Sequence, residues 1–180
     1  MKRLIMICAG LLSVGTGCAP TAEPMAGPAA NTAPTASADV RNVLGESKAA
    51  VTASQLGDSI RVRVEAMGMP RGTYAAHVHA VGLCNPPDFT SAGPHWNPTG
   101  AQHGKNNPAG MHKGDLPNLT VGSDGRGSME YAIPASMLVG GANALLDADG
   151  AAVVIHAQAD DYRTDPAGNA GARMACGVLR

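Results

Sequence analysis

Apolar and charged residues alternate with a period of two in the clearest segment of the chain. Residues 60–65 read IRVRVE, so every second side chain is apolar and those between are charged. This alternation predicts a β-strand with one face in the core and the other in water, because successive side chains of a strand point to opposite faces. The preceding Leu56-Gly57-Asp58 is typical of a hairpin turn.

Similar short segments, separated by clusters of Gly, Asp and Pro, predict further strands. They lie at residues 41–46, 49–55, 73–80, 117–121, 127–133, 151–157 and 173–179. With 60–65 they make eight short strands, so the sequence predicts an all-β fold, an eight-stranded antiparallel sandwich or barrel. Residues 82–115 and 159–172 do not follow this rhythm. We expect two long ordered loops there, and such loops on a β scaffold usually carry function.

The composition agrees with a loop-rich β protein and excludes one class of partner. Aromatic residues make up only 3% of the chain, whereas 23 Gly and 13 Pro disfavour an architecture of long packed helices. The formal charge is −1, and without Lys2 and Arg3 the balance is 11 basic against 14 acidic residues, or −3. The basic surface that nucleic-acid binding requires is missing, so we expect no nucleic-acid partner.

The N-terminus has the layout of a bacterial secretory signal. Lys2 and Arg3 precede an apolar run over residues 4–14, which is too short to remain as a transmembrane helix. We therefore expect residues 1–17 to be a cleaved signal peptide. The small residues directly before Cys18 resemble the lipobox of bacterial lipoproteins, which predicts lipidation of Cys18. Ordinary signal cleavage at a nearby site is the alternative.

Residues 18–38 would then form a linker between the lipid and the folded domain. From residue 19 the segment is mostly Ala, Pro, Thr and Gly with one charge. This composition offers too little apolar surface to offset the entropy of folding, so we expect a flexible tether and a folded domain at 39–180. The protein would be exported to the periplasm or cell surface and held at a membrane by Cys18. The sequence leaves monomer and homodimer both open.

Cysteine usage fits an exported protein. Cys8 lies in the predicted signal peptide and Cys18 carries the predicted lipid, so the folded domain retains Cys84 and Cys176. Two cysteines in an oxidising compartment fit one disulfide bond. Two buried free thiols are the alternative.

The six histidines are clustered rather than scattered. His77 and His79 lie on a predicted strand, where residues i and i+2 share a face and can present two imidazoles to one ion. The remaining four are His95, His103 and His112 in the first long loop, and His156 at the end of the penultimate strand. Asp115 gives the loop three nitrogens and one oxygen, a donor set suited to tetrahedral zinc. The alternative is a packing role for the strand pair and simple solvation for the loop residues.

Several segments, in order along the chain, carry a resemblance to a known family. They are AHVH at 76–79, SAGPHWNP at 91–98, HG at 103–104, HKGD at 112–115, VVIH at 153–156, ADD at 159–161 and GNAGARMACG at 168–177. In these segments the chain resembles the copper/zinc superoxide dismutases from about residue 39 to the C-terminus. The resemblance implies a Greek-key β architecture and an enzyme that converts superoxide to dioxygen and hydrogen peroxide.

The resemblance also implies which metals bind and where. It gives His77, His79, His95 and His156 as copper ligands, and His95, His103, His112 and Asp115 as zinc ligands. His95 would therefore bridge the two ions. Asp160 would hydrogen-bond to one copper and one zinc histidine, and Arg173 would guide the superoxide anion toward copper. The predicted disulfide between Cys84 and Cys176 would tie the metal loop to the last strand.

The chain departs from the family pattern at positions that are not ligands. Ala75 and Ala76 stand where the family usually has Gly-Phe, and Ala80 replaces an acidic residue.

A copper- and zinc-binding or storage lipoprotein of the same fold without turnover is the alternative function, because fold alone does not fix activity. The complete copper set, the shared histidine and Arg173 favour the enzyme. A surface adhesion domain would leave the clustered histidines unexplained.

Overall fold

The computed structural model describes residues 33–141 and 143–180. Within them the chain forms strands and one short 3₁₀ helix. The elements are β1 (Thr35–Asn42), β2 (Ser47–Leu56), β3 (Ser59–Ala66), β4 (Gly72–Tyr74), β5 (Ala76–His79), η1 (Thr90–Ala92), β6 (Leu119–Val121), β7 (Gly127–Ile133), β8 (Ala152–His156) and β9 (Arg173–Val178). The predicted all-β class is confirmed. Over the described ranges, no helix has the length and apolarity needed to cross a bilayer.

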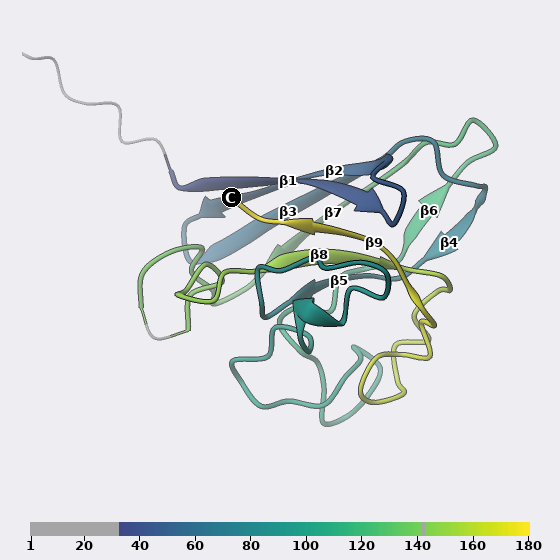
Figure 1. Cartoon of the computed structure of the whole chain (residues 1–180). Coiled ribbons are helices and arrows are strands. Elements are labelled where there is room, and N and C mark those ends of the chain that lie inside the picture. Colours follow the sequence, from purple (N-terminus) through teal and green to yellow (C-terminus); the bar gives the residue numbers. More distant parts are fainter. Residues whose placement is uncertain (1–32, 142) are drawn as a thin grey trace, which may run out of the picture. The chain divides into compact units, whose positions relative to one another are not determined.

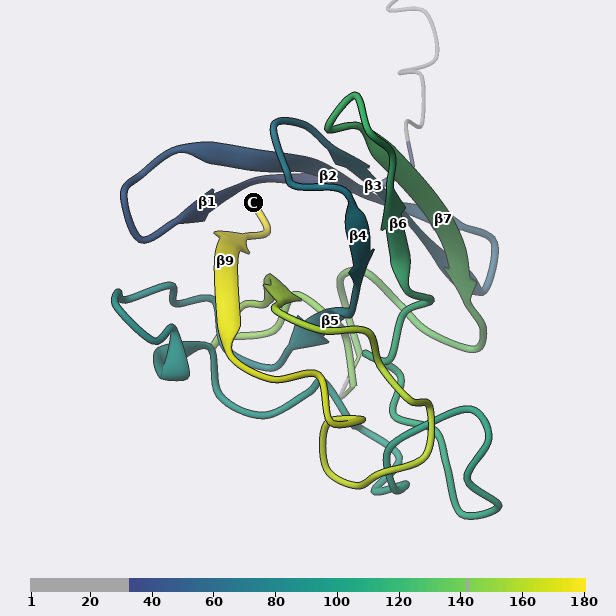
Figure 2. The same cartoon turned by 90° about the vertical axis from the view of Figure 1, so that its right-hand side faces the viewer.

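Seven strands form one curled antiparallel sheet in the order β5-β8-β9-β1-β2-β3-β7, and β4 pairs with β6 in a small second sheet. β1, β2, β3 and β7 make one layer, with β9 and β5 on the other side of the core (Figures 1 and 2). The two parts of the large sheet join where Arg41 and Asn42 of β1 pair with Cys176 and Ala175 of β9. The pairing of β3 with β7 across three intervening strands is the long-range connection expected of a Greek key.

The period-two pattern of residues 60–65 is confirmed. Ile60, Val62 and Val64 of β3 have no exposed surface, while the charged residues between them face solvent. β8 differs because all of its residues are buried. Its inner residues Val153 and Ile155 join the main core, and its outer face is covered by the loop that follows β5. Burial on both faces explains why β8 is a continuous apolar run in the sequence.

The first strand was misplaced by the sequence prediction. A strand was expected at 41–46, but β1 occupies Thr35–Asn42 and a turn follows it. The buried positions of β1 are Ala36, Ala38 and Val40. Two of these three are alanines, so the alternation has little hydrophobic contrast and the composition of residues 35–38 resembles that of the predicted tether. The folded domain therefore includes residues before 39.

The predicted strand at 73–80 is two strands. β4 pairs with β6 and β5 pairs with β8, so the chain passes from one sheet to the other at Ala75. The two expected long loops are present, one between β5 and β6 and the other between β8 and β9. The predictions for the signal peptide, for lipidation of Cys18 and for the tether up to residue 32 lie outside the described residues.

Candidate metal centre

The outer face of β5 and β8 collects three histidines. His77 and His79 are two residues apart on β5, and His77 pairs directly with Val154 of β8. His156 is two residues beyond Val154, so it shares that face. Because both strands keep their inner residues in the core, these imidazoles project away from it, toward the two long loops.

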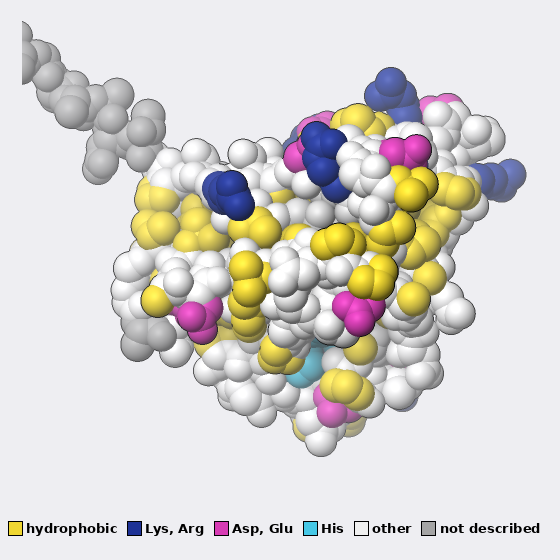
Figure 3. All heavy atoms as spheres, viewed as in Figure 1, with side chains coloured by type: hydrophobic (Ala, Val, Ile, Leu, Met, Phe, Trp, Pro, Cys, Tyr) yellow, Lys and Arg dark blue, Asp and Glu magenta, His cyan; other side chains and the backbone are white. Residues whose placement is uncertain are grey.

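The loop after β5 brings its own histidines back over this face. His95 forms an isolated β-bridge with His79, and Asp115 forms one with His77. The loop can lie so close because Gly114 has no side chain, and a Cβ there would be 2.2 Å from the carbonyl oxygen of Val78. All six histidines are buried together with Asp115 and Asp160, and in the described part of the chain Ser136 is the one other buried polar residue. Accordingly, little histidine surface is visible on the face in Figure 3.

Four ring nitrogens in this cluster have no hydrogen-bond partner. They are Nδ1 of His77 and Nε2 of His79, His95 and His156, the complete set of unpartnered buried side-chain N and O atoms found in residues 33–141 and 143–180. These four residues offer ligand atoms that all lie within 4.8 Å of one another. Unpaired buried polar atoms are costly, so four of them facing one space fit a bound metal ion.

The opposite nitrogens of these rings are held by the protein. His79 Nδ1 donates to the carbonyl of Gly93 at 2.9 Å, and His156 Nδ1 donates to the carbonyl of Gly171 at 3.2 Å. A carbonyl can only accept, so the proton of each neutral ring is on Nδ1 and the lone pair is on Nε2. His77 Nε2 lies 3.0 Å from a carboxylate oxygen of Asp160. The partners therefore fix both the tautomer and the direction of each free lone pair.

Burial also keeps three of the rings neutral. It lowers the pKa of His79 to about 2, of His156 to about 3 and of His95 to about 4. Each is further lowered by neighbouring histidines, although hydrogen bonds to Gly93, Gly171 and Asp115 act in the opposite direction. Neutral imidazoles are the form that binds metals.

A second donor set lies on the far side of His95. Nδ1 of His95, His103 and His112 lie 2.9, 3.0 and 3.1 Å from the same carboxylate oxygen, Oδ1 of Asp115. The His95 and His112 nitrogens are 3.3 Å apart. In a tetrahedral zinc site with bonds of about 2.0 Å the ligand atoms are separated by roughly 3.3 Å. Three nitrogens and one oxygen at this spacing therefore fit zinc.

His77 also lies close enough to this set to form a group with His95, His103 and Asp115. However, its Nε2 is occupied by Asp160, and its Nδ1 is one of the four unpartnered nitrogens of the first set. His112, whose Nδ1 is already in contact with His95 and Asp115, is the better fourth member. The remaining oxygen of Asp115 accepts backbone N–H groups from Gly104 and His112.

Asp160 connects the two donor sets. Its Oδ2 contacts Nε2 of His77 and its Oδ1 contacts Nε2 of His103, both at 3.0 Å. Burial opposes ionisation of Asp160, but these histidine contacts outweigh it and lower its pKa. Likewise, hydrogen bonds to Asp115 and Asp160 overcome the effect of burial and raise the pKa of His103 to about 9. Gly168 packs against Asp160 in a left-handed conformation, and a Cβ there would overlap the carboxylate.

The sequence and structure of this chain match one family of proteins. The sequence pattern that defines copper/zinc superoxide dismutase (SODC) matches residues 46–179. The chain belongs to the copper/zinc superoxide dismutase family. The Cu-Zn superoxide dismutase of Caulobacter vibrioides is 42% identical over 139 residues, which cover 76% of this chain and 80% of that protein. Superoxide dismutase [Cu-Zn] 1 of Aquifex aeolicus is 40% identical over 145 residues, covering 79% and 86%.

A solved structure agrees with the fold. The crystal structure of a SOD-like protein from Bacillus subtilis aligns with a TM-score of 0.75 at 39% identity, covering 80% of this chain and 97% of that one. The family binds copper and zinc, and the two donor sets of this chain have the nitrogen and oxygen ligands that suit those metals. The predicted family and metals are thus confirmed.

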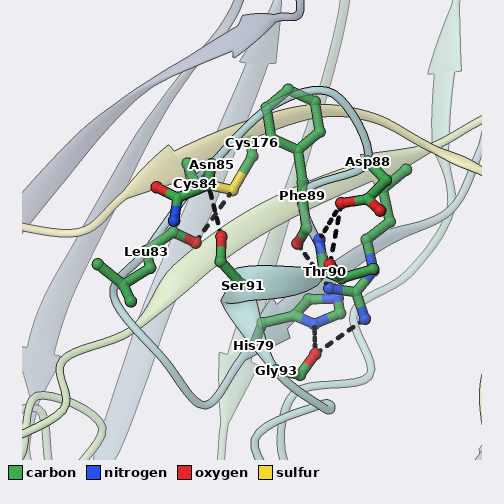
Figure 4. Close-up of a disulfide and its surroundings, with 11 residues drawn as sticks. His79, Leu83, Cys84, Asn85, Asp88, Phe89, Thr90, Ser91, Gly93 and Cys176 are labelled. Carbon is green, nitrogen blue, oxygen red and sulfur yellow. Dashed lines mark hydrogen bonds between the residues drawn. A yellow bond between two sulfur atoms is a disulfide. The ribbon is translucent and has the colours of Figure 1, made fainter.

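The disulfide predicted from the cysteine count is present. Cys84 and Cys176 are joined, which ties the loop after β5 to β9 across 92 residues (Figure 4). The two cysteines pack with Phe89, Ala92 and Val154 in a small apolar cluster on the outer face of the sheet. In the chain-entropy model a crosslink of this length contributes about 4.6 kcal/mol to stability. The loop that covers the metal residues is therefore pinned to the sheet.

A cavity of about 740 Å³ opens beside His95, His156 and Arg173. The Arg173 guanidinium is fixed by two hydrogen bonds of 2.8 Å, from Nη1 to the carbonyl of Phe89 and from Nη2 to that of Gly93. The Gly93 carbonyl is also the acceptor for His79 (Figure 4). Burial lowers the pKa of Arg173, but arginine remains charged at neutral pH. The cavity thus has a fixed cation beside two of the unpartnered ring nitrogens.

Sequence reasoning missed two residues that support the centre. The side chain of Asn118 donates to the Asp160 carbonyl at 3.0 Å and accepts the Asp160 N–H at 2.8 Å, which fixes the backbone at Asp160. Asp165 accepts the backbone N–H of His103 at 2.6 Å. Neither contact has a signal in the sequence, because both join segments about 40 or more residues apart through ordinary polar side chains.

Acid should destabilise the metal-free protein. The folded-state pKa values of His79, His156 and His95, about 2, 3 and 4, lie below the usual 6.5. Between these values and pH 6.5 the unfolded chain binds protons that the folded chain does not, so the free energy of unfolding falls as the pH falls. His103 acts in the opposite sense, but its stabilising contribution is complete below pH 6.5 and is lost only between 6.5 and about 9.

We therefore expect the urea midpoint of chelator-treated protein to decrease from pH 6.5 to about pH 5. His79→Gln should show a shallower decrease, because one of the three buried rings is gone. A midpoint that is equal or higher at the lower pH would contradict this account.

Proposed function

We propose that this protein dismutates superoxide to dioxygen and hydrogen peroxide at a centre that holds copper and zinc. The observation that carries the proposal is the set of four buried, unpartnered ring nitrogens next to a separate set of three nitrogens and one oxygen. His95 contributes one ring nitrogen to each set. Relatives that are named Cu-Zn superoxide dismutases support the same activity.

In this proposal each donor set has one metal. The copper ligands are His77, His79, His95 and His156, and the zinc ligands are His95, His103, His112 and Asp115. When bound, copper would supply the one-electron chemistry that superoxide dismutation needs, and zinc would supply a redox-inert charge. The neutral ring of His95 would have to release its one remaining N–H proton to serve both ions, which binding of two cations favours.

The protein's own residues have three tasks. The carbonyls of Gly93 and Gly171 keep the lone pairs of His79 and His156 directed inward. Asp160 couples His77 to His103, so that the two donor sets keep their relative orientation. Arg173 attracts and orients the superoxide anion in a protein whose net charge is slightly negative.

We also propose that the protein acts outside the cytoplasm as a lipoprotein anchored through Cys18. The disulfide supports export, because such bonds persist in oxidising compartments. The basic and apolar residues before Cys18 support signal-directed export and acylation. The intact mass of the exported protein tests this, since a lipidated N-terminal Cys18 adds the mass of its acyl groups.

Exported protein should contain one copper and one zinc per chain and show cyanide-sensitive superoxide dismutation. Elemental analysis and a superoxide assay on one preparation measure both. Full metal loading with no turnover would instead indicate a metal-binding or storage protein.

A His95→Ala variant tests the shared ligand, because the copper EPR spectrum of wild-type protein should change when zinc is removed and that of the variant should not. An equal response in both proteins would contradict the bridge.

Arg173→Ala should lower kcat/KM for superoxide by about tenfold or more, since electrostatic guidance is worth roughly 10- to 1,000-fold. The loss should shrink at high ionic strength, where guidance is screened. Pulse radiolysis at several salt concentrations measures both effects. Arg173→Lys should keep part of the rate, and Arg61→Ala, which removes an exposed arginine of β3 outside the cavity, is the charge-matched control. Equal rates for Arg173→Ala and Arg61→Ala would contradict guidance.

A further inference from the structure

Asp165 lies on the loop between β8 and β9, where it hydrogen-bonds to one residue of the zinc donor set and lies near a second. Its Oδ1 accepts the backbone N–H of His103 at 2.6 Å. The same oxygen lies 4.0 Å from Nε2 of His112. The carboxylate therefore faces two of the three histidines in this set from outside, and one of its contacts is among the shortest hydrogen bonds of the site.

The groups that face the ring nitrogens of the other histidines show why a carboxylate close to Nε2 of His112 is important. In the described residues, His77 and His103 each contact Asp160, while His79 and His156 donate to glycine carbonyls. Ligating histidines generally need such an acceptor behind the ring, which sets their orientation and basicity. For His112 the group that faces Nε2 is the Asp165 carboxylate, which at 4.0 Å is within ion-pair range but beyond hydrogen-bond distance.

The same loop holds His103 from two directions. Asp160 contacts its ring at Nε2, and Asp165, five residues later, accepts its backbone N–H. The turn between them is closed by Asp161, which accepts the backbone N–H groups of Arg163 and Thr164, and by the Gly168 N–H, which bonds to the Thr164 carbonyl at 2.6 Å. Asp165 is consequently held at a defined place although about half of its side chain is exposed.

We propose that Asp165 is a positioning residue for zinc, which fixes the backbone at His103 and orients the ring of His112. The inference rests on the zinc site of the proposed function. It makes the loop between β8 and β9 a structural part of that site through two carboxylates, the buried Asp160 and the half-exposed Asp165. Loss of Asp165 then loosens two zinc ligands without removing either.

Two variants of Asp165 separate its two contacts. Asp165→Asn keeps an oxygen that can accept the His103 N–H but removes the charge that faces His112. Asp165→Ala removes both. Asp147→Asn is the matched control, because Asp147 lines the same cavity and its side chain accepts a hydrogen bond from Asp149 instead of a histidine.

The measurements are zinc transfer from the fully loaded protein to a chromophoric chelator and the His103 amide proton shift of the reduced, diamagnetic protein. Asp165→Ala should weaken zinc retention about 10- to 100-fold, the usual effect of removing such a partner. The His103 amide proton should shift upfield in Asp165→Ala and stay near its wild-type position in Asp165→Asn. Asp165→Asn should lose at least about threefold in zinc retention, a smaller loss than Asp165→Ala, and Asp147→Asn should match wild type.

The proposal is overturned if the Asp165 variants retain zinc as wild type does, or if Asp147→Asn weakens zinc as much as Asp165→Asn, since the effect would then be one of general charge. If Asp165→Ala does not fold, Asp165→Asn decides by the same comparison with Asp147→Asn. Wild-type protein that retains no zinc would overturn the proposed centre itself. Normal wild-type zinc with unaffected Asp165 variants would overturn this inference alone.

Discussion

Four imidazole nitrogens that are buried without a hydrogen-bond partner are the constraint on which the structure of this protein depends. Each would be costly in a metal-free interior, and they face one another across a space smaller than 5 Å. The fold provides the interactions that keep them there. A rigid β face sets the spacing of His77, His79 and His156, and a loop that pairs with β5 brings His95 to the same place. A cation that accepts four lone pairs converts this arrangement from a cost into a source of stability.

The remaining contacts of the site keep these lone pairs directed inward. Carbonyl and carboxylate acceptors lie behind the rings, and they come from segments far apart in the chain. Asp160 is the central one, because it contacts a histidine of each donor set and its own backbone is held by Asn118. The two long loops are thus ordered by the same contacts that orient the ligands. This explains how loops rich in Gly and Pro can carry a precise site.

The sequence was most informative where chemistry and periodicity coincide. The alternation in 60–65 predicted β3, and the spacing of His77 and His79 predicted a shared face, because both follow from the geometry of an extended chain. β1 was misplaced because its buried residues include Ala36 and Ala38, whose small side chains barely differ from a linker composition. Asn118 and Asp165 could not be predicted, since their contacts arise only when distant loops pack together. The ligand sets came from the family resemblance, and the structure adds the acceptors behind the rings of His77, His79, His103 and His156.

The Gly93 carbonyl connects the covalent framework of the protein to its chemistry. It accepts hydrogen bonds from His79 and from Arg173, so one atom orients a metal-facing ring and a cation that lines the cavity. Gly93 lies in the loop that Cys84 pins to β9, the strand that begins with Arg173. Reduction of the disulfide would therefore release the loop from β9 at Cys84, while the Arg173 hydrogen bonds to Phe89 and Gly93 would still connect the two segments. Because these contacts share one loop, loosening it disturbs ligand direction and anion guidance together rather than either alone.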